Sequence, residues 1–183
     1  MLLEGLAQRL AGSSPNDLSK VFNRATWIWL AIGRWQPKKC SCSDKYAMRI
    51  LMFLAKQYTF HPFEKTLPSA KDSTGQEEVT DAAVVFVHSE PQDELDSSGL
   101  ETRFVKNVKW IAGKRGFRNV VLHSFTHLAE TSASPQFAEA FLQGAAQRLR
   151  STGYQVTLTP FGWMCEWNLS VYGESLAKVY KSL

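Results

Sequence analysis

From residue 48 onwards, short apolar runs alternate with polar segments, and the spacing of the apolar positions changes from run to run. Five short runs, rich in branched and aromatic residues, predict strands at 48–54, 82–90, 118–125, 154–159 and 163–171. Residues 57–66 alternate between apolar and polar and predict a further strand, which Pro62 confines to a sheet edge. Because helical patterns separate the later strands, the order predicts an α/β domain with four to six strands.

Three segments have helical spacing. Ser98-Gly-Leu-Glu101 reads as a capping box at the start of the first helix, and Gly116 is expected to end it. Ser134 followed by Pro135 predicts the start of the second helix, and Gly153 its end. The third is expected at 175–183. The residues predicted to face the core are Leu100, Phe104, Val108, Ile111, Phe137, Phe141, Leu142, Ala145, Leu149, Leu176, Val179 and Leu183.

Two strands end in loops that combine polar and aromatic groups. The strand at 118–125 leads into Phe125, Thr126 and His127, and the strand at 154–159 leads into Pro160-Phe-Gly-Trp163. Strands separated by a helix of this length usually lie side by side in one sheet. We therefore expect the two loops to form the two lips of one pocket.

Residues 1–47 follow a different pattern. Apolar residues at helical spacing predict helices at 2–11 and 16–32, and a polar linker follows at 36–44. Met48 then stands at the first position of the first strand. It is either a core methionine or the natural start, with residues 1–47 as an upstream extension, helical or disordered.

Composition narrows the class of protein. An apolar fraction of 44% with six Trp in 183 residues predicts a packed core. The net charge of +4 is carried by residues 1–47, whereas residues 48–183 are neutral overall, so any contact with nucleic acid needs a local patch. The first predicted helix carries basic residues that could form such a patch, namely Arg103, Lys106, Lys109, Lys114 and Arg115. The same residues can equally form an ordinary solvated helix face. Three cysteines give no disulfide framework and favour a cytoplasmic location.

Candidate chemistry is sparse. The sequence has no Gly-rich phosphate loop and no zinc-protease motif, and we expect neither a metal nor a cofactor. His123 and His127 lie on a strand that runs into a loop, where a shared metal is not expected. His127 is a candidate polar group, or a surface histidine. Cys165 is a candidate nucleophile, or a small apolar residue in a strand.

The two loops resemble those of the editing domain of archaeal threonyl-tRNA synthetases. That family has an aromatic-Ala-His-Leu-Ser loop, a helix ending in Arg-Gly-Tyr/Phe-Asn-Val, and the motif Ala-Pro-Phe-Gly-Tyr/Trp. This sequence has Phe125-Thr-His-Leu128, Ser151-Thr-Gly-Tyr-Gln-Val156 and Thr159-Pro-Phe-Gly-Trp163 in the same order. The resemblance covers residues 48–183, and residues 1–47 have no counterpart.

The resemblance implies a D-aminoacyl-tRNA deacylase-like fold, a homodimer, and hydrolysis of serine wrongly attached to threonine tRNA. In such a site, backbone groups hold the amino acid and a water is positioned at the ester carbonyl. It also implies contact with the aminoacylated 3′ end of tRNA and, as a further candidate partner, threonyl-tRNA synthetase. By position, His127 and Cys165 become the catalytic candidates. The substrate-binding candidates are Ser89, Phe125, Thr126, Pro160, Phe161, Gly162, Trp163 and Met164, and the tRNA-binding candidates are Arg103, Lys106 and Lys109.

Some positions depart from the family pattern. Cys165 stands where the family has a functionally important lysine, Met164 replaces a tyrosine, and Lys178 replaces a glutamate. Three functions therefore stay open. The first is a free-standing editing hydrolase acting in trans on mischarged tRNA, and the second is a non-catalytic module that binds tRNA or a synthetase. The third is an unrelated small-molecule hydrolase on the same fold.

Overall fold

The computed structural model describes residues 48–183, which belong to one compact unit. The helices expected within residues 1–47 lie outside the described residues. The elements are β1 (Arg49–Lys65), β2 (Glu77–His88), the short 3-10 helix η2 (Pro91–Leu95), α3 (Ser97–Gly113), β3 (Asn119–Ser124), α4 (Pro135–Arg150), β4 (Gln155–Leu158), β5 (Trp163–Val171), the 3-10 helix η3 (Ser175–Ala177) and β6 (Lys178–Ser182). Within residues 48–183, no helix is long and apolar enough to cross a membrane.

All six strands form one mixed sheet. Its order is β4-β3-β2-β1, after which β5 pairs with the second half of β1 and β6 with the first half. The strands β2, β3 and β4 run parallel and are joined by α3 and α4, whereas β1 is antiparallel to each of its neighbours. The carboxyl ends of β2, β3 and β4 therefore meet at the same edge of the sheet. The side-by-side arrangement predicted for the strands at 118–125 and 154–159 is confirmed.

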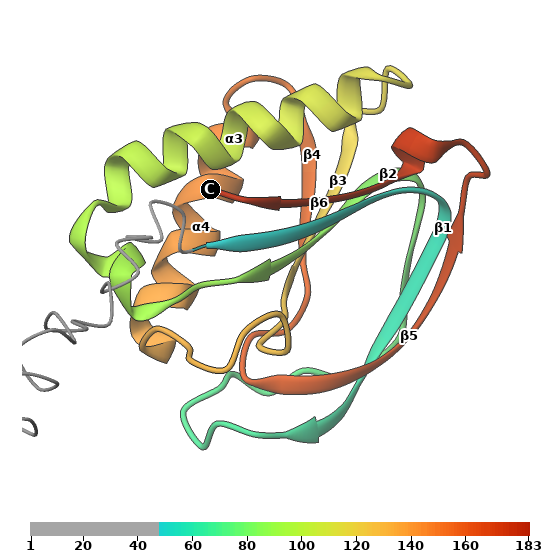
Figure 1. Ribbon diagram of the computed structural model, residues 1–183. Coiled ribbons are helices and arrows are strands. Elements are labelled where there is room, and N and C mark those ends of the chain that lie inside the picture. The colour runs from blue at the N-terminus through green and yellow to red at the C-terminus, as the bar shows by residue number, and fades with distance from the viewer. Residues whose placement is uncertain (1–47) are drawn as a thin grey trace, which may run out of the picture. The chain divides into compact units, whose positions relative to one another are not determined.

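β1 is one long strand where the sequence suggested two. The ladder between β1 and β5 shifts register between Ala55 and Gln57, and this irregularity lets the strand bend without breaking. Figure 1 shows the consequence, because β1 runs along the middle of the sheet and then turns down beside β5. Pro62 lies beyond Phe60, the last residue of β1 that pairs with β2, so its missing N–H leaves that ladder intact. The edge position predicted for Pro62 is confirmed, but the separate strand is wrong.

The helix predicted at 175–183 is also wrong, because the segment forms η3 and then β6. Val179 and Leu183 fit a helical face, but Val179 and Tyr180 also favour a strand, and a segment this short fits both periods. The first half of β1 pairs with β2 on one side, and its other side is the edge that β6 occupies. Pairing with that edge satisfies the backbone of residues 178–182, and Leu183 N donates to Met48 O at 2.9 Å.

The two α-helices cover one face of the sheet, with α3 lying across the top of the view in Figure 1 and α4 beside it. The predicted inward faces are confirmed for both, with Phe137 only partly buried. Phe104 of α3 meets Phe141 of α4 edge to face, at 5.4 Å between ring centroids. A smaller apolar cluster around Tyr58 and Phe86 fills the opposite face, inside the bend of β1.

The ends of α4 follow the sequence more closely than those of α3. Ser134 caps α4 by accepting a hydrogen bond from Phe137 N, with Pro135 in the first turn, as predicted. In α3, however, the cap is Asp96, which accepts from Gly99 N, so the capping box predicted at Ser98 is wrong. The Glu101 side chain instead forms an ion pair with Arg148 of α4, with 3.4 Å between Oε1 and Nη1.

Candidate functional site

A cavity of about 560 Å³ opens at the edge where the carboxyl ends of β2, β3 and β4 meet. Both predicted lips line it, as do residues from the start of α4 and from β5. The lining residues named as candidates from the sequence are Ser89, Phe125, Thr126, His127, Pro160, Phe161, Gly162, Trp163, Met164 and Cys165. The expectation that the two loops form one pocket is therefore confirmed in its geometry. Arg103, Lys106 and Lys109 lie on α3 and do not line the cavity.

The first lip is held by the end of β2. Phe125 N donates to Val87 O at 2.9 Å, which extends the β2–β3 pairing past the end of β3. The Phe125 ring packs edge to face against Phe86 at 5.2 Å, and the His127 ring packs against Phe125 at the same centroid distance. Phe125 is thus half-buried, whereas His127 remains exposed at the mouth of the cavity.

The loop that follows is tied down at several points. Arg49 on β1 donates to Leu128 O at 2.9 Å and pairs with Glu90 at 2.8 Å. His88 Nε2 lies 2.7 Å from Thr131 O, and a backbone bond joins Ala133 to Ser89. Glu90, next to the lining residue Ser89, lies outside the cavity lining and pairs with Arg49.

The second lip closes against a segment that the sequence did not single out. Gly162 O accepts hydrogen bonds from Thr66 N, Leu67 N and the Thr66 hydroxyl, at 2.8, 3.1 and 2.9 Å. Trp163 Nε1 donates to Lys71 O at 3.0 Å. Thr66 and Leu67 consequently become part of the cavity wall. Nothing in the polar pattern of residues 66–71 indicated this, because the contact depends on the bend of β1.

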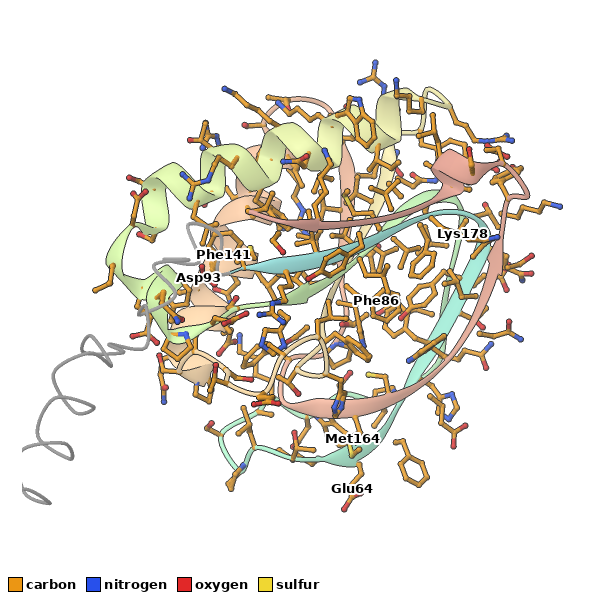
Figure 2. The ribbon with its side chains drawn as sticks, in the orientation of Figure 1. Glu64, Phe86, Asp93, Phe141, Met164 and Lys178 are labelled. Atoms are coloured by element: carbon orange, nitrogen blue, oxygen red, sulfur yellow. The ribbon has the colours of Figure 1, made fainter. Side chains whose placement is uncertain are left out.

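The β5 ribbon supplies the outer wall. Figure 2 shows Met164 at the lower end of the sheet near Glu64, its partner in the β1–β5 ladder, and Phe86 in the middle of the fold. Met164 is exposed at the rim, while Cys165 is half-buried. Burial raises the pKa of the Cys165 thiol, so the group is neutral near pH 7. Within residues 48–183, Cys165 makes no hydrogen bond to a histidine, and the structure therefore lacks the partner that a nucleophilic cysteine needs.

His123 is a site residue that the sequence analysis missed. It is buried at 6% exposure on β3, lines the cavity, and its Nδ1 lies 2.9 Å from the Thr159 hydroxyl at the end of β4. Burial lowers its pKa to about 4, so the imidazole is neutral at physiological pH. One signal could have found it: His123 precedes Phe125 by two residues, and alternate residues of a strand share a face.

The cavity wall carries no aspartate, glutamate, lysine or arginine among the described residues. Its polar groups are hydroxyls, two histidines, one thiol and backbone amides. Such a wall suits a ligand held by hydrogen bonds and apolar contact rather than by ion pairing. The groups available for hydrolysis here are the histidines, backbone donors and an oriented water.

The comparisons with known proteins agree with this architecture. Residues 48–183 match the family model described as the archaea-specific editing domain of threonyl-tRNA synthetase. The chain is 28% identical over 137 residues to threonine–tRNA ligase of Methanosphaerula palustris and 28% over 141 residues to that of Hyperthermus butylicus. Each alignment covers 74% of this chain but only 22% and 23% of the respective ligase, so the chain spans less than a quarter of these relatives.

A solved structure supports the fold alone. The c-Myc DNA unwinding element binding protein superposes with a TM-score of 0.52 at 9% identity, covering 74% of this chain and 98% of that protein. Together with the family match, this confirms the D-aminoacyl-tRNA deacylase-like α/β fold predicted from the sequence. With the match spanning all of residues 48–183, the chain belongs to the archaea-specific editing domain family of threonyl-tRNA synthetase.

Proposed function

We propose that this chain removes a wrongly attached amino acid, serine in the first instance, from the 3′ end of threonine tRNA, acting in trans. One observation carries the proposal: the family match extends over all the described residues, and these enclose a cavity between the two motif loops. The cavity is large enough for a terminal adenosine with its aminoacyl group. The aromatic and hydroxyl lining suits an ester held by hydrogen bonds and apolar contact.

In the proposed reaction, the ester carbonyl lies between the two lips. His127 at the mouth and backbone N–H groups of the loops orient the substrate and a water, and water attack releases the free amino acid and a 3′-hydroxyl. Cys165 lies on the outer wall of this site. Its thiol is neutral, so it adds no positive charge where the transition state becomes negative. We therefore expect slow hydrolysis.

The deciding measurement is deacylation of seryl-tRNA(Thr) by the purified chain, with threonyl-tRNA and D-aminoacyl-tRNAs alongside and no synthetase present. Cys165→Lys should raise the rate, on the order of a hundredfold, because it restores a charged donor beside the ester. Cys165→Ala should leave the rate nearly unchanged. Strong native activity that Cys165→Ala abolishes would show that the thiol is a nucleophile or base, contrary to the proposal.

A second candidate function is a non-catalytic module that binds tRNA or threonyl-tRNA synthetase. The absence of charged groups from the described cavity wall favours it. Tight binding of seryl-tRNA(Thr) without hydrolysis, in the native chain and in Cys165→Lys alike, would select it. The basic residues Arg103, Lys106 and Lys109 are proposed to contact the tRNA backbone, and the cytoplasmic location stays a prediction.

We also propose that the chain forms a homodimer. Tyr180 is 53% exposed on β6, directly across from the half-buried Leu51 in the sheet, and Trp167 is 46% exposed on β5. Exposed large apolar groups of this kind are often covered by association. Light scattering at micromolar concentration should give twice the chain mass of 20.6 kDa. A monomer mass under these conditions would contradict the proposal.

A further inference from the structure

One polar pair joins the two strands that carry the lips of the cavity. His123 comes from β3, Thr159 follows β4, and His123 Nδ1 lies 2.9 Å from Thr159 Oγ1. The pair is fixed by its surroundings, because Thr159 N donates to Leu122 O at 3.1 Å and both residues are buried. His123 lies just before the Phe125-Thr-His-Leu128 motif of the first loop, and Thr159 is the first residue of the motif Thr159-Pro-Phe-Gly-Trp163.

Aromatic rings hold the imidazole in place. The Phe86 ring meets it edge to face at 4.9 Å between centroids, and the Phe125 ring lies at 6.1 Å. The ring therefore has one orientation in which Nδ1 meets Thr159. The same burial keeps the ring uncharged, since it lowers the pKa of His123 to about 4. A fixed, neutral imidazole in a cavity wall offers a single directional hydrogen bond to a ligand.

The hydrogen-bond directions follow from the partners. The Thr159 hydroxyl also reaches Leu122 O at 3.5 Å, as a donor. The Thr159 hydroxyl oxygen can then accept a hydrogen bond from His123 Nδ1–H, so that both donors, Nδ1–H and the hydroxyl, have an acceptor. This tautomer leaves Nε2 as an acceptor. Within the described residues no hydrogen bond to Nε2 is found, and His123 is part of the cavity wall, so Nε2 can take a partner from a bound ligand.

The ligand group that Nε2 takes must therefore be a donor. The α-amino group is common to all aminoacyl esters, so a hydrogen bond to it would not distinguish one amino acid from another. A hydroxyl needs only the hydrogen bond. We infer that His123, positioned by Thr159, accepts a hydrogen bond from the side-chain hydroxyl of the bound amino acid and thereby selects hydroxylated aminoacyl esters over alanyl esters. The inference rests on the proposed function for the identity of the bound group.

The first test measures binding by the full chain, so that it does not depend on activity. The probes are adenosines that carry seryl or alanyl groups through a non-hydrolysable 3′-amide, titrated by calorimetry. The native chain should bind the seryl probe about threefold to tenfold more tightly, as expected for one neutral hydrogen bond. His123→Phe should bring the two affinities together. Thr159→Val, which removes only the hydroxyl that orients the ring, should reduce the preference.

Matched controls separate this role from a structural one. Thr157 lies on β4, two residues before Thr159, and His61 is half-buried on β1; neither residue lines the cavity. Thr157→Val and His61→Gln should therefore both keep the native preference. If His123→Phe does not fold, the native chain still gives an answer by NMR. The ¹⁵N resonance of His123 Nε2 should shift with the seryl probe and not with the alanyl probe.

Equal affinity of the native chain for the two probes, no binding of either, or an unchanged preference in His123→Phe would overturn the inference. The outcome is separable from that of the proposed function. Preferential seryl binding without hydrolysis of seryl-tRNA(Thr) would leave the inference standing and contradict the hydrolase. Hydrolysis of seryl and alanyl esters with equal kcat/KM would support the hydrolase and contradict the inference about His123.

Discussion

His123 is buried among aromatic rings, and its protonation links the site to the stability of the fold. Its pKa in the folded chain is about 4, below the 6.5 of an ordinary histidine, because burial disfavours the charged ring. Between these two values the unfolded chain binds more protons, so this group's contribution to stability is complete above pH 6.5 and is lost as the pH falls towards 4. Asp93 acts in the opposite sense, because burial raises its pKa.

We predict that His123→Phe, which cannot bind a proton, loses this part of the pH dependence. For a shift of this size, the free energy of unfolding of the native chain should fall by about 3 kcal/mol more than that of the variant between pH 7.5 and 4. Urea unfolding of both proteins across this range measures the difference, and the subtraction removes the contribution of Asp93. Parallel curves would show that His123 is not desolvated as described.

At the scale of elements, the second lip depends on close contact between two loops. Gly162 has φ +78°, and a Cβ there would lie 2.8 Å from Ala70 Cβ and 3.0 Å from Leu67 Cβ. Gly153, after α4, has φ +86°, but a Cβ there meets nothing within 4 Å among the described residues. The two glycines share the left-handed conformation and differ in their surroundings, which makes them a matched pair.

We predict that Gly153→Ala costs about 1 kcal/mol, which is the price of the left-handed backbone alone. Gly162→Ala should cost about 2–3 kcal/mol, because the loop at 66–71 must also move away. Chemical denaturation of both variants gives the two values. Equal losses would mean that the loop at 66–71 yields freely and does not fix the cavity wall.

At the scale of the whole molecule, the six strands of the described sheet all lie within residues 48–183. Each of them pairs with at least one other described strand, and Met48 is fully buried, with its carbonyl accepting from Leu183 N. We predict that a chain beginning at Met48 keeps its fold and a melting temperature within about 5 °C of the full chain, near 1 kcal/mol for a domain of this size. Circular dichroism on heating tests this, and a larger drop would show that the first 47 residues stabilise the core.

The sequence by itself determined the features that depend on local pattern. Branched and aromatic runs predicted the strands, and the spacing in α4 predicted its inward face together with the Ser134 cap. The helix between the strands at 118–125 and 154–159 predicted that they are neighbours, and from this followed the pocket between Phe125 and Trp163. These features depend on the periods of helix and strand and on the short links between neighbouring elements.

Only the tertiary structure decided the features that depend on distant partners. Residues 178–182 fit a helix and a strand equally well, and the free edge of β1 selected the strand. The bend of β1 brought Thr66 to Gly162, which is 96 positions away in the chain. His123 and Thr159 each looked ordinary in a strand and became a site pair once β3 and β4 placed them 2.9 Å apart. A local pattern fixes the period of a segment, whereas hydrogen bonds and packing across the sheet fix which residues meet.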